Sequence, residues 1–231
     1  MKTEIDGAGP LTNDLISTLN GAVDQAEDSG SETILFLQVV GSATPHSIEA
    51  WPGDIELHAV NRWERLMRRI ERANFITMCL VEGACSALAL ELLLVCDRRW
   101  ASDDFSMRLA RATGGIWPGM SLYRLTTELG QRQTRKLFLE LTVIDASTAE
   151  ELTIVDEVLE DPVNIFDRVS ALLQKAPLQD FAVRRRLMQD SLTTGFDEAL
   201  GAHLAACDRQ FRRSSAANNE HGSKHNLASA V

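Results

Sequence analysis

The sequence predicts an α/β fold of repeated strand-turn-helix units, followed by a C-terminal helical region. Three observations support this: an apolar strand-like run lies between two helical patterns, the same alternation returns further along the chain, and from residue 163 to about residue 213 the spacing is helical throughout. With 231 residues, of which 45% are apolar, the chain can bury the core of one or two domains.

The first unit is a helix followed by a strand. Leu11–Asp28 carries apolar residues at helical spacing, and either Thr12 or Asn13 can cap its N-terminus. Thr33–Val40, with the sequence TILFLQVV, is the clearest strand of the chain.

The second unit repeats this order. Ile55–Ala73 has an apolar helical face, and Phe75–Val81 is expected to form a short buried strand. A helix that starts near Cys85 and contains Glu91 should follow. The resulting order of elements favours parallel strands joined by crossover helices.

The next segment begins after a loop marked by Pro118 and Gly119. A pair of helices is predicted over roughly Ser121–Glu140, then a short helix over Ser147–Leu152 and a strand over Ile154–Leu159. We therefore divide the chain into a core over 1–161, a helical region over 162–213 and a tail over 214–231. The tail is small and polar without periodicity, which predicts disorder.

The overall charge excludes some partners. A formal net charge of −10 and an isoelectric point near 5.0 argue against a nucleic acid or an anionic membrane surface as the main partner. The N-terminus lacks the apolar region of a signal peptide, and no apolar run is long enough for a membrane span. Four cysteines without metal-type spacing predict reduced core thiols, a cytoplasmic protein and no metal site.

A single acid interrupts the most apolar part of the chain. Between Ala84 and Cys96, Glu91 is the only acidic or basic side chain. Burying an unpaired carboxylate costs roughly several kcal/mol, so a glutamate in this run indicates a functional site. Two interpretations fit: a proton-transferring group, or a structural residue that faces a cavity, a solvent channel or an arginine of another element. Motifs for serine hydrolases, phosphate loops, zinc proteases and dinucleotide-binding folds are absent.

Several short motifs occur at spacings that resemble the enoyl-CoA hydratase/isomerase (crotonase) superfamily. They are Glu82-Gly83-Ala84, Glu91-Leu92, Cys96-Asp97, Ala101-Ser102, the GIWPG segment Gly115–Gly119, and Ala149–Val158. The resemblance covers about Ile34 to Leu159. It implies a crotonase-like spiral of strand-turn-helix units, with C-terminal helices that pack on the core or on a neighbouring subunit of a trimer or hexamer.

The same resemblance implies the chemistry. In that superfamily, two backbone N–H groups form an oxyanion hole for the thioester oxygen of an acyl-CoA, and by position these are Gly53 and Leu88 here. Glu91 matches the first catalytic glutamate, three residues after Leu88. The substrate carries coenzyme A itself, so no separate cofactor is expected.

The sequence departs from the family pattern at two places. The position of the second glutamate of hydratases is Arg111, so only one acid is carried over, and we expect Arg111 and Trp117 to line the substrate pocket. The glycine triplet before the first glutamate is replaced by Ala87-Leu88-Ala89, which alters the space beside the thioester.

Coenzyme A phosphates require cations in an acidic protein. The run Arg184-Arg185-Arg186 is the stronger candidate, and a second set of arginines lies along the helix after Gly53. For any single arginine of the second set, the sequence favours a solvated helix face with Glu64 and Glu71 as local partners.

The retained single acid and the replaced triplet are similar to one branch of the superfamily. This branch contains the accessory enoyl-CoA hydratase-like proteins of dihydroxyphenylglycine formation in glycopeptide-antibiotic pathways. The resemblance implies dehydration or isomerisation of a polyketide-derived CoA thioester toward 3,5-dihydroxyphenylacetyl-CoA, beside a type III polyketide synthase. The alternatives are a crotonase-fold scaffold that stimulates the synthase with little chemistry of its own, and a β-oxidation hydratase, which Arg111 disfavours.

Overall fold

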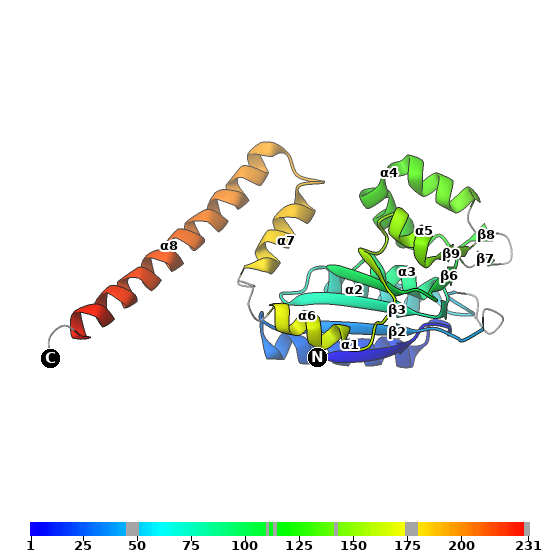
Figure 1. Ribbon diagram of the computed structural model, residues 1–231. Helices are drawn as coiled ribbons and strands as arrows, with labels where there is room; N and C mark the ends of the chain where they lie inside the picture. The colour runs from blue at the N-terminus through cyan, green and yellow to red at the C-terminus, as the bar shows by residue number, and fades with distance from the viewer. Residues whose placement is uncertain (45–50, 110, 113–114, 141–142, 174–179, 229–231) are drawn as a thin grey trace. The chain divides into compact units, whose positions relative to one another are not determined.

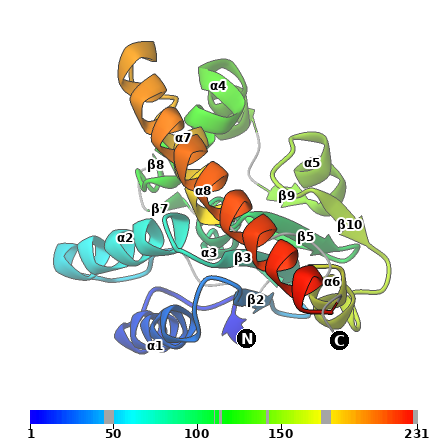
Figure 2. The same cartoon turned by 90° about the vertical axis from the view of Figure 1, so that its left-hand side faces the viewer.

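The computed structural model describes residues 1–44, 51–109, 111–112, 115–140, 143–173 and 180–228 of the chain. The chain forms two compact units, Met1–Gln179 and Asp180–Val231. Strands and helices alternate along the first unit, and the second unit is helical (Figure 1 and Figure 2).

The first unit contains a five-stranded parallel sheet, which confirms the α/β class. Its spatial order is β1-β2-β3-β5-β10. The strands are β1 (Lys2–Asp6), β2 (Ile34–Val40), β3 (Ile76–Glu82), β5 (Arg98–Ser102) and β10 (Glu157–Leu159). Parallel pairing requires a crossover between neighbouring strands, which explains why helices alternate with strands along the sequence.

Two amphipathic helices build the main core against the sheet. They are α1 (Asn13–Ser29) and α2 (Leu57–Glu71). Thr12 caps α1 as predicted, because its hydroxyl accepts the N–H of Leu15 at 3.1 Å. The apolar faces of both helices pack with the inward side chains of β2, which include Leu35 and Leu37.

The opposite side of β2 is covered by α6 (Ile165–Leu173). The ring of Phe166 meets Phe36 edge to face, with centroids 5.3 Å apart, and Ile165 is buried. This packing moves the boundary of the first unit. We expected the core to end at residue 161, but it continues to Gln179 because α6 belongs to it.

Short strands form two smaller sheets beside the main one. β4 (Ala84–Cys85), β6 (Ser106–Arg108) and β9 (Val143–Asp145) make a mixed sheet, and β7 (Arg111–Ala112) pairs with β8 (Gly115–Ile116). Sequence patterns did not reveal them, since two or three residues carry no measurable periodicity.

Three helices of the first unit follow the predictions closely. They are α3 (Leu88–Leu93), α4 (Ser121–Glu140) and α5 (Ala146–Glu151). α3 begins three residues later than expected, because Ala84 and Cys85 pair in β4. α4 is a pair of helices, as predicted, since Gly130 interrupts it with φ of 77° and ψ of 160°.

The second unit consists of α7 (Phe181–Asp190) and α8 (Phe196–Ala228). α8 continues through the segment after residue 213 for which the sequence predicted disorder. Residues added to an existing helix each gain a hydrogen bond without a new nucleation step, and no proline interrupts this segment. Within the described part of the chain, no helix is both long enough and apolar enough to cross a membrane.

The start of the second sheet depends on a close approach between two backbones. Gly41 follows β2, and its N–H donates to the carbonyl of Glu82 at 2.7 Å. A Cβ at Gly41 would lie 2.4 Å from the carbonyl oxygen of Ala84, closer than atoms can pack. This glycine therefore fixes β4 and, through it, the entry to α3.

We expect Gly41→Ala to lower the free energy of unfolding by about 2 kcal/mol or more, because two backbones would have to separate. Gly21→Ala is the matched control: Gly21 lies inside α1 with open space around its Cβ position, so alanine should stabilise the protein by up to ~1 kcal/mol. Urea denaturation measures both. Equal effects of the two substitutions would contradict the close approach.

Candidate active site

The lone acid of the apolar run is buried at the heart of the first unit. Glu91 lies on α3, whose six residues are all buried, and its own exposure is 2%. The segment folds this way because the other five residues of α3 are Leu or Ala, and a helix that is apolar all round is buried. Glu91 therefore depends on partners from other elements.

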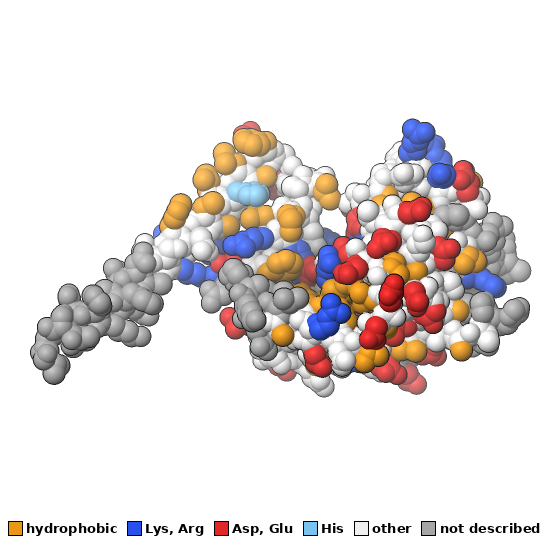
Figure 3. Space-filling view, viewed as in Figure 1, with side chains coloured by type: hydrophobic (Ala, Val, Ile, Leu, Met, Phe, Trp, Pro, Cys, Tyr) orange, Lys and Arg blue, Asp and Glu red, His pale blue; other side chains and the backbone are white. Residues whose placement is uncertain are grey.

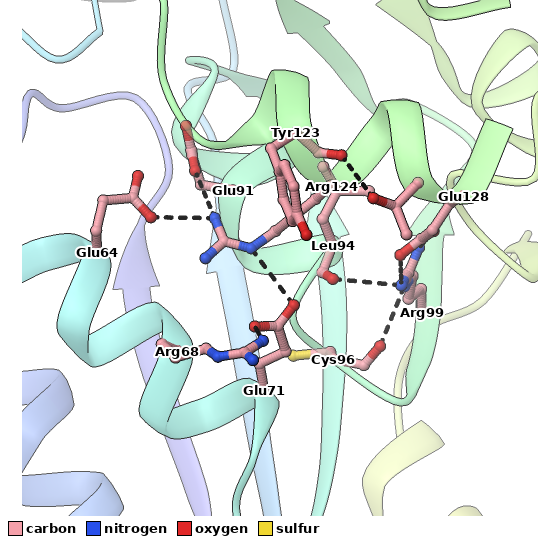
Figure 4. Close-up of polar contacts among 11 residues, drawn as sticks. Glu64, Arg68, Glu71, Glu91, Leu94, Cys96, Arg99, Tyr123, Arg124 and Glu128 are labelled. Atoms are coloured by element: carbon pink, nitrogen blue, oxygen red, sulfur yellow. Dashed lines mark hydrogen bonds and ion pairs between the residues drawn. The ribbon is translucent and has the colours of Figure 1, made fainter. Parts of the chain in front are cut away.

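The partners of Glu91 come from the start of α4. Nη1 of Arg124 lies 3.6 Å from Oε2 of Glu91, and Arg124 is itself only 6% exposed (Figure 4). Ser121, one turn before Arg124, lies close enough for its hydroxyl and backbone N–H to favour the ionised form of the Glu91 carboxyl. The sequence analysis named an arginine of another element as one structural partner for Glu91, and the structure contains such an arginine.

Arg124 also binds two acids of α2. Its Nη1 donates to Oε2 of Glu64 at 3.2 Å, and its Nε lies 3.7 Å from Oε1 of Glu71. Glu71 has a second cation, Nη1 of Arg68, at 2.7 Å. One buried guanidinium therefore contacts three carboxylates from two helices, and its single charge is shared among them.

This shared charge leaves Glu91 poorly compensated. The pKa of Glu91 is raised to about 7, first by burial and then by the negative charge of Glu64, while Arg124 and Ser121 act in the opposite direction. Among the described residues, no hydrogen-bond donor reaches its Oε2 atom. Near neutral pH, the carboxyl can therefore exist in both protonation states, which is what a proton-transferring group requires.

A salt bridge ties α4 to the main sheet and so fixes Arg124. Arg99 of β5 donates to both carboxylate oxygens of Glu128 at 2.7 and 2.9 Å. The same side chain donates to the carbonyl of Cys96 at 3.1 Å, at the end of the segment that carries α3. This two-pronged contact joins β5, α3 and α4 (Figure 4).

The loop of the GIWPG segment approaches the acid. A Cβ at Gly119 would lie 2.8 Å from Oε1 of Glu91 and 2.8 Å from two indole atoms of Trp117. The structure thus brings Trp117, which the sequence assigned to the substrate pocket, next to the candidate catalytic acid. A side chain at Gly119 would fill the space between them.

The two predicted oxyanion donors are placed as follows. Leu88 is the first residue of α3, and its N–H donates to Oγ of Ser86 at 3.3 Å, a long bond. Gly53 has φ of 85°, and within the described residues its N–H makes no hydrogen bond. Their joint role in holding an oxygen stays a prediction.

The remaining predicted site residues lie on other elements. Arg111 lies in β7, and its side chain is outside the described part of the chain. Arg184, Arg185 and Arg186 lie on α7 in the second unit. Arg185 is buried there, with its guanidinium 5.6 Å from the ring of Phe181. Phosphate binding by this run stays a prediction.

Sequence reasoning missed Arg124, Ser121, Glu64 and Glu71. The only signal was indirect: a buried acid demands a cation or hydrogen-bond donors, but nothing in the spacing says which arginine supplies them. Arg124 and Glu64 are 60 positions apart, so only the packing of α2 against α4 brings them together.

The chain belongs to the enoyl-CoA hydratase/isomerase family. The sequence model of that family, described as Enoyl-CoA hydratase/isomerase, matches residues 57–225, which include α3 and α4. This match agrees with the fold and with an acid held at the start of a short buried helix.

Individual relatives support the same family. The chain is 36% identical over 209 residues to an enoyl-CoA-hydratase of Amycolatopsis orientalis, covering 90% of this chain and 94% of that protein. It is 28% identical over 103 residues, 44% of this chain and 35% of the other, to a mitochondrial Delta(3,5)-Delta(2,4)-dienoyl-CoA isomerase of Dictyostelium discoideum. In fold, it resembles the crystal structure of an enoyl-CoA hydratase from Shewanella pealeana, with a TM-score of 0.75 and 20% sequence identity. The match covers 91% of this chain and 84% of that chain.

We expect Glu91→Gln to change how stability depends on pH. The folded-state pKa of Glu91, about 7, lies above its ordinary value of 4.5, so its stabilising contribution is complete below about pH 4.5 and is lost as the pH rises through 7. Glutamine stays neutral and does not suffer this loss. Between about pH 5 and about pH 8, wild type should lose about 2 kcal/mol of unfolding free energy relative to the variant.

Urea denaturation of both proteins across this pH range measures the difference. Parallel pH dependences of wild type and Glu91→Gln would show that the carboxyl titrates at its ordinary pKa and is not held in a desolvated site.

Proposed function

We propose that this protein dehydrates or isomerises a CoA thioester, with Glu91 as the proton-transferring group. The backbone N–H groups of Gly53 and Leu88 bind the thioester oxygen. The observation that carries the proposal is the burial of Glu91 at the start of α3, beside a glycine loop, with a pKa near neutrality. Membership of the hydratase/isomerase family supplies the substrate class.

The elimination can proceed with one acid. The Glu91 carboxylate removes a proton from the α-carbon, and the electron pair moves onto the thioester oxygen to form an enolate. When the enolate collapses, the bond from the β-carbon to its hydroxyl breaks, and Glu91 returns the same proton to the departing oxygen, which leaves as water. Isomerisation uses the same first step and returns the proton to another carbon.

Two features of the site suit this sequence. The negative charge of the enolate develops on one oxygen, where fixed N–H donors stabilise it more than they stabilise the neutral thioester. A group that acts first as a base and then as an acid works best with a pKa close to the working pH, and the pKa of Glu91 is about 7. The Leu88 N–H donates a long hydrogen bond to Ser86 Oγ, and a bound thioester oxygen would replace Ser86 Oγ as its acceptor.

We propose a polyketide-derived CoA thioester as the substrate. The support is the resemblance in sequence: the second glutamate is Arg111, and Ala87-Leu88-Ala89 replaces the glycine triplet. These departures are similar to the accessory proteins of dihydroxyphenylglycine formation. In this proposal, the protein assists a type III polyketide synthase in forming 3,5-dihydroxyphenylacetyl-CoA during antibiotic biosynthesis.

A second candidate is a scaffold that stimulates the synthase with little catalysis of its own. The observation that favours it is the replacement of the second hydratase glutamate by Arg111. Turnover by a Glu91 variant separates the two candidates, because a scaffold does not need the carboxylate.

We also propose a homo-oligomer, a trimer or a hexamer. The second unit exposes apolar side chains along α7, α8 and the turn between them that would be buried by another copy (Figure 3). These residues are Met188, Leu192, Phe196, Leu200, Leu204 and Phe211. Figure 3 also shows acidic side chains gathered over the first unit, which leaves α7 and α8 as the more apolar surface.

We expect a mass of three or six chains in sedimentation equilibrium or light scattering. Leu204→Glu, which places a charge at a residue that is 60% exposed in the single chain, should shift the population toward monomer. A monomeric mass for the wild-type protein at micromolar concentration would count against the assembly.

We expect Glu91→Gln to lower turnover by about 100-fold or more, since positioned acid-base groups contribute this much. Crotonyl-CoA hydration, and formation of 3,5-dihydroxyphenylacetyl-CoA with the synthase present or absent, provide the two assays. Glu151→Gln is the matched control, because Glu151 is an exposed acid at the end of α5. Full stimulation of the synthase by Glu91→Gln would support the scaffold and reject the catalytic role.

A further inference from the structure

Glu64 and Glu91 contact the same nitrogen atom. Nη1 of Arg124 lies 3.2 Å from Oε2 of Glu64 and 3.6 Å from Oε2 of Glu91. The first contact is a hydrogen bond, whereas Oε2 of Glu91 accepts none from the described residues. Figure 4 shows both carboxylates directed at the same nitrogen of the guanidinium, one from α2 and one from α3.

The geometry indicates that the two acids compete for one cation. Glu64 is 21% exposed and Glu91 is 2% exposed, so solvent can stabilise a charge on Glu64 far better than one on Glu91. The Nε side of Arg124 is engaged by Glu71 at 3.7 Å. The guanidinium therefore cannot pair fully with Glu91 while it also holds Glu64.

We propose that Glu64 is a positioning residue that holds Arg124 back from Glu91, so that the buried carboxyl stays only partly paired. The proposal rests on the proposed function in one respect only: the partial pairing serves catalysis because Glu91 acts there as both base and acid. The residue pair itself is defined by the contacts of α2, α3 and α4.

The described groups that face Glu91 account for the direction of the effect. Arg124 and Ser121 of α4 favour the ionised form, whereas burial and Glu64 of α2 favour the protonated form. The loop on the remaining side contributes Trp117 and Gly119, which are uncharged. Removing the charge of Glu64 should therefore free Arg124 to pair with Glu91 and lower the titration midpoint.

The test is a direct titration of the Glu91 carboxyl in the full-length protein. Carbon-13 NMR of protein labelled at the glutamate carboxyls reports the midpoint, and Glu91→Gln assigns the signal. We expect Glu64→Gln to lower the midpoint by about one pH unit, the size expected when an opposite charge is left in place and a like charge is removed. The pH optimum of turnover should move in the same direction.

Glu71→Gln is the matched control. It removes the same charge from the same helix and from the same guanidinium, but on the Nε side, away from the nitrogen that Glu91 contacts. We expect less than half of the shift seen with Glu64→Gln. An equal or larger shift would overturn the specific role of Glu64.

Substitution of Arg124 should act in the opposite direction. Arg124→Gln should raise the midpoint by about one pH unit or more, and Arg124→Lys, which keeps the charge, should restore part of the wild-type value. Because Arg124→Gln removes the cation that three carboxylates share, thermal melting checks that it folds, and Arg124→Lys supplies the result if it does not. A general loss of structure cannot produce shifts of opposite sign from the two sites.

The inference and the proposed function fail separately. An unchanged or higher midpoint in Glu64→Gln overturns the inference, whatever the activity of Glu91→Gln. Full activity of Glu91→Gln, together with a lowered midpoint in Glu64→Gln, leaves the competition for Arg124 intact and rejects Glu91 as the catalytic acid.

Discussion

The removal of one carboxylate from water is the constraint on which the site depends. Glu91 is buried on α3, and among the described residues the cation that contacts it is Arg124, which already holds Glu64 by a hydrogen bond. A fully paired acid would remain ionised, and an unpaired acid in the same place would remain protonated. Burial, together with the negative charge of Glu64 and the incomplete pairing with Arg124, brings the pKa of Glu91 to about 7.

The other elements of the first unit hold α2, α3 and α4 around Glu91. β4 leads directly into α3 because Gly41 lets two backbones meet, and Arg99 ties α4 to β5 through Glu128. α2 presents its acids from the other side while its apolar face packs into the main core. The position of each charged group therefore follows from apolar packing and backbone pairing elsewhere.

The helices and the buried strands could be predicted because they carry long, regular patterns. α1, α2, β2 and β3 were located to within a few residues, and the interruption of α4 at Gly130 fits the predicted pair of helices. β1 and β5 were missed for a physical reason. Their sequences, KTEID and RRWAS, are rich in charged residues, and they are strands only because neighbours far along the chain supply hydrogen bonds.

The sequence by itself determined the α/β class, the enoyl-CoA hydratase/isomerase family and the acid at position 91, since these depend on local patterns and on residue types at fixed spacing. Only the tertiary structure decided that Arg124, Glu64 and Ser121 surround that acid, and that α6 completes the first unit. Charges interact through space, and the residues involved come from helices whose contacts are set by packing. No spacing along the chain encodes which arginine a buried glutamate will meet.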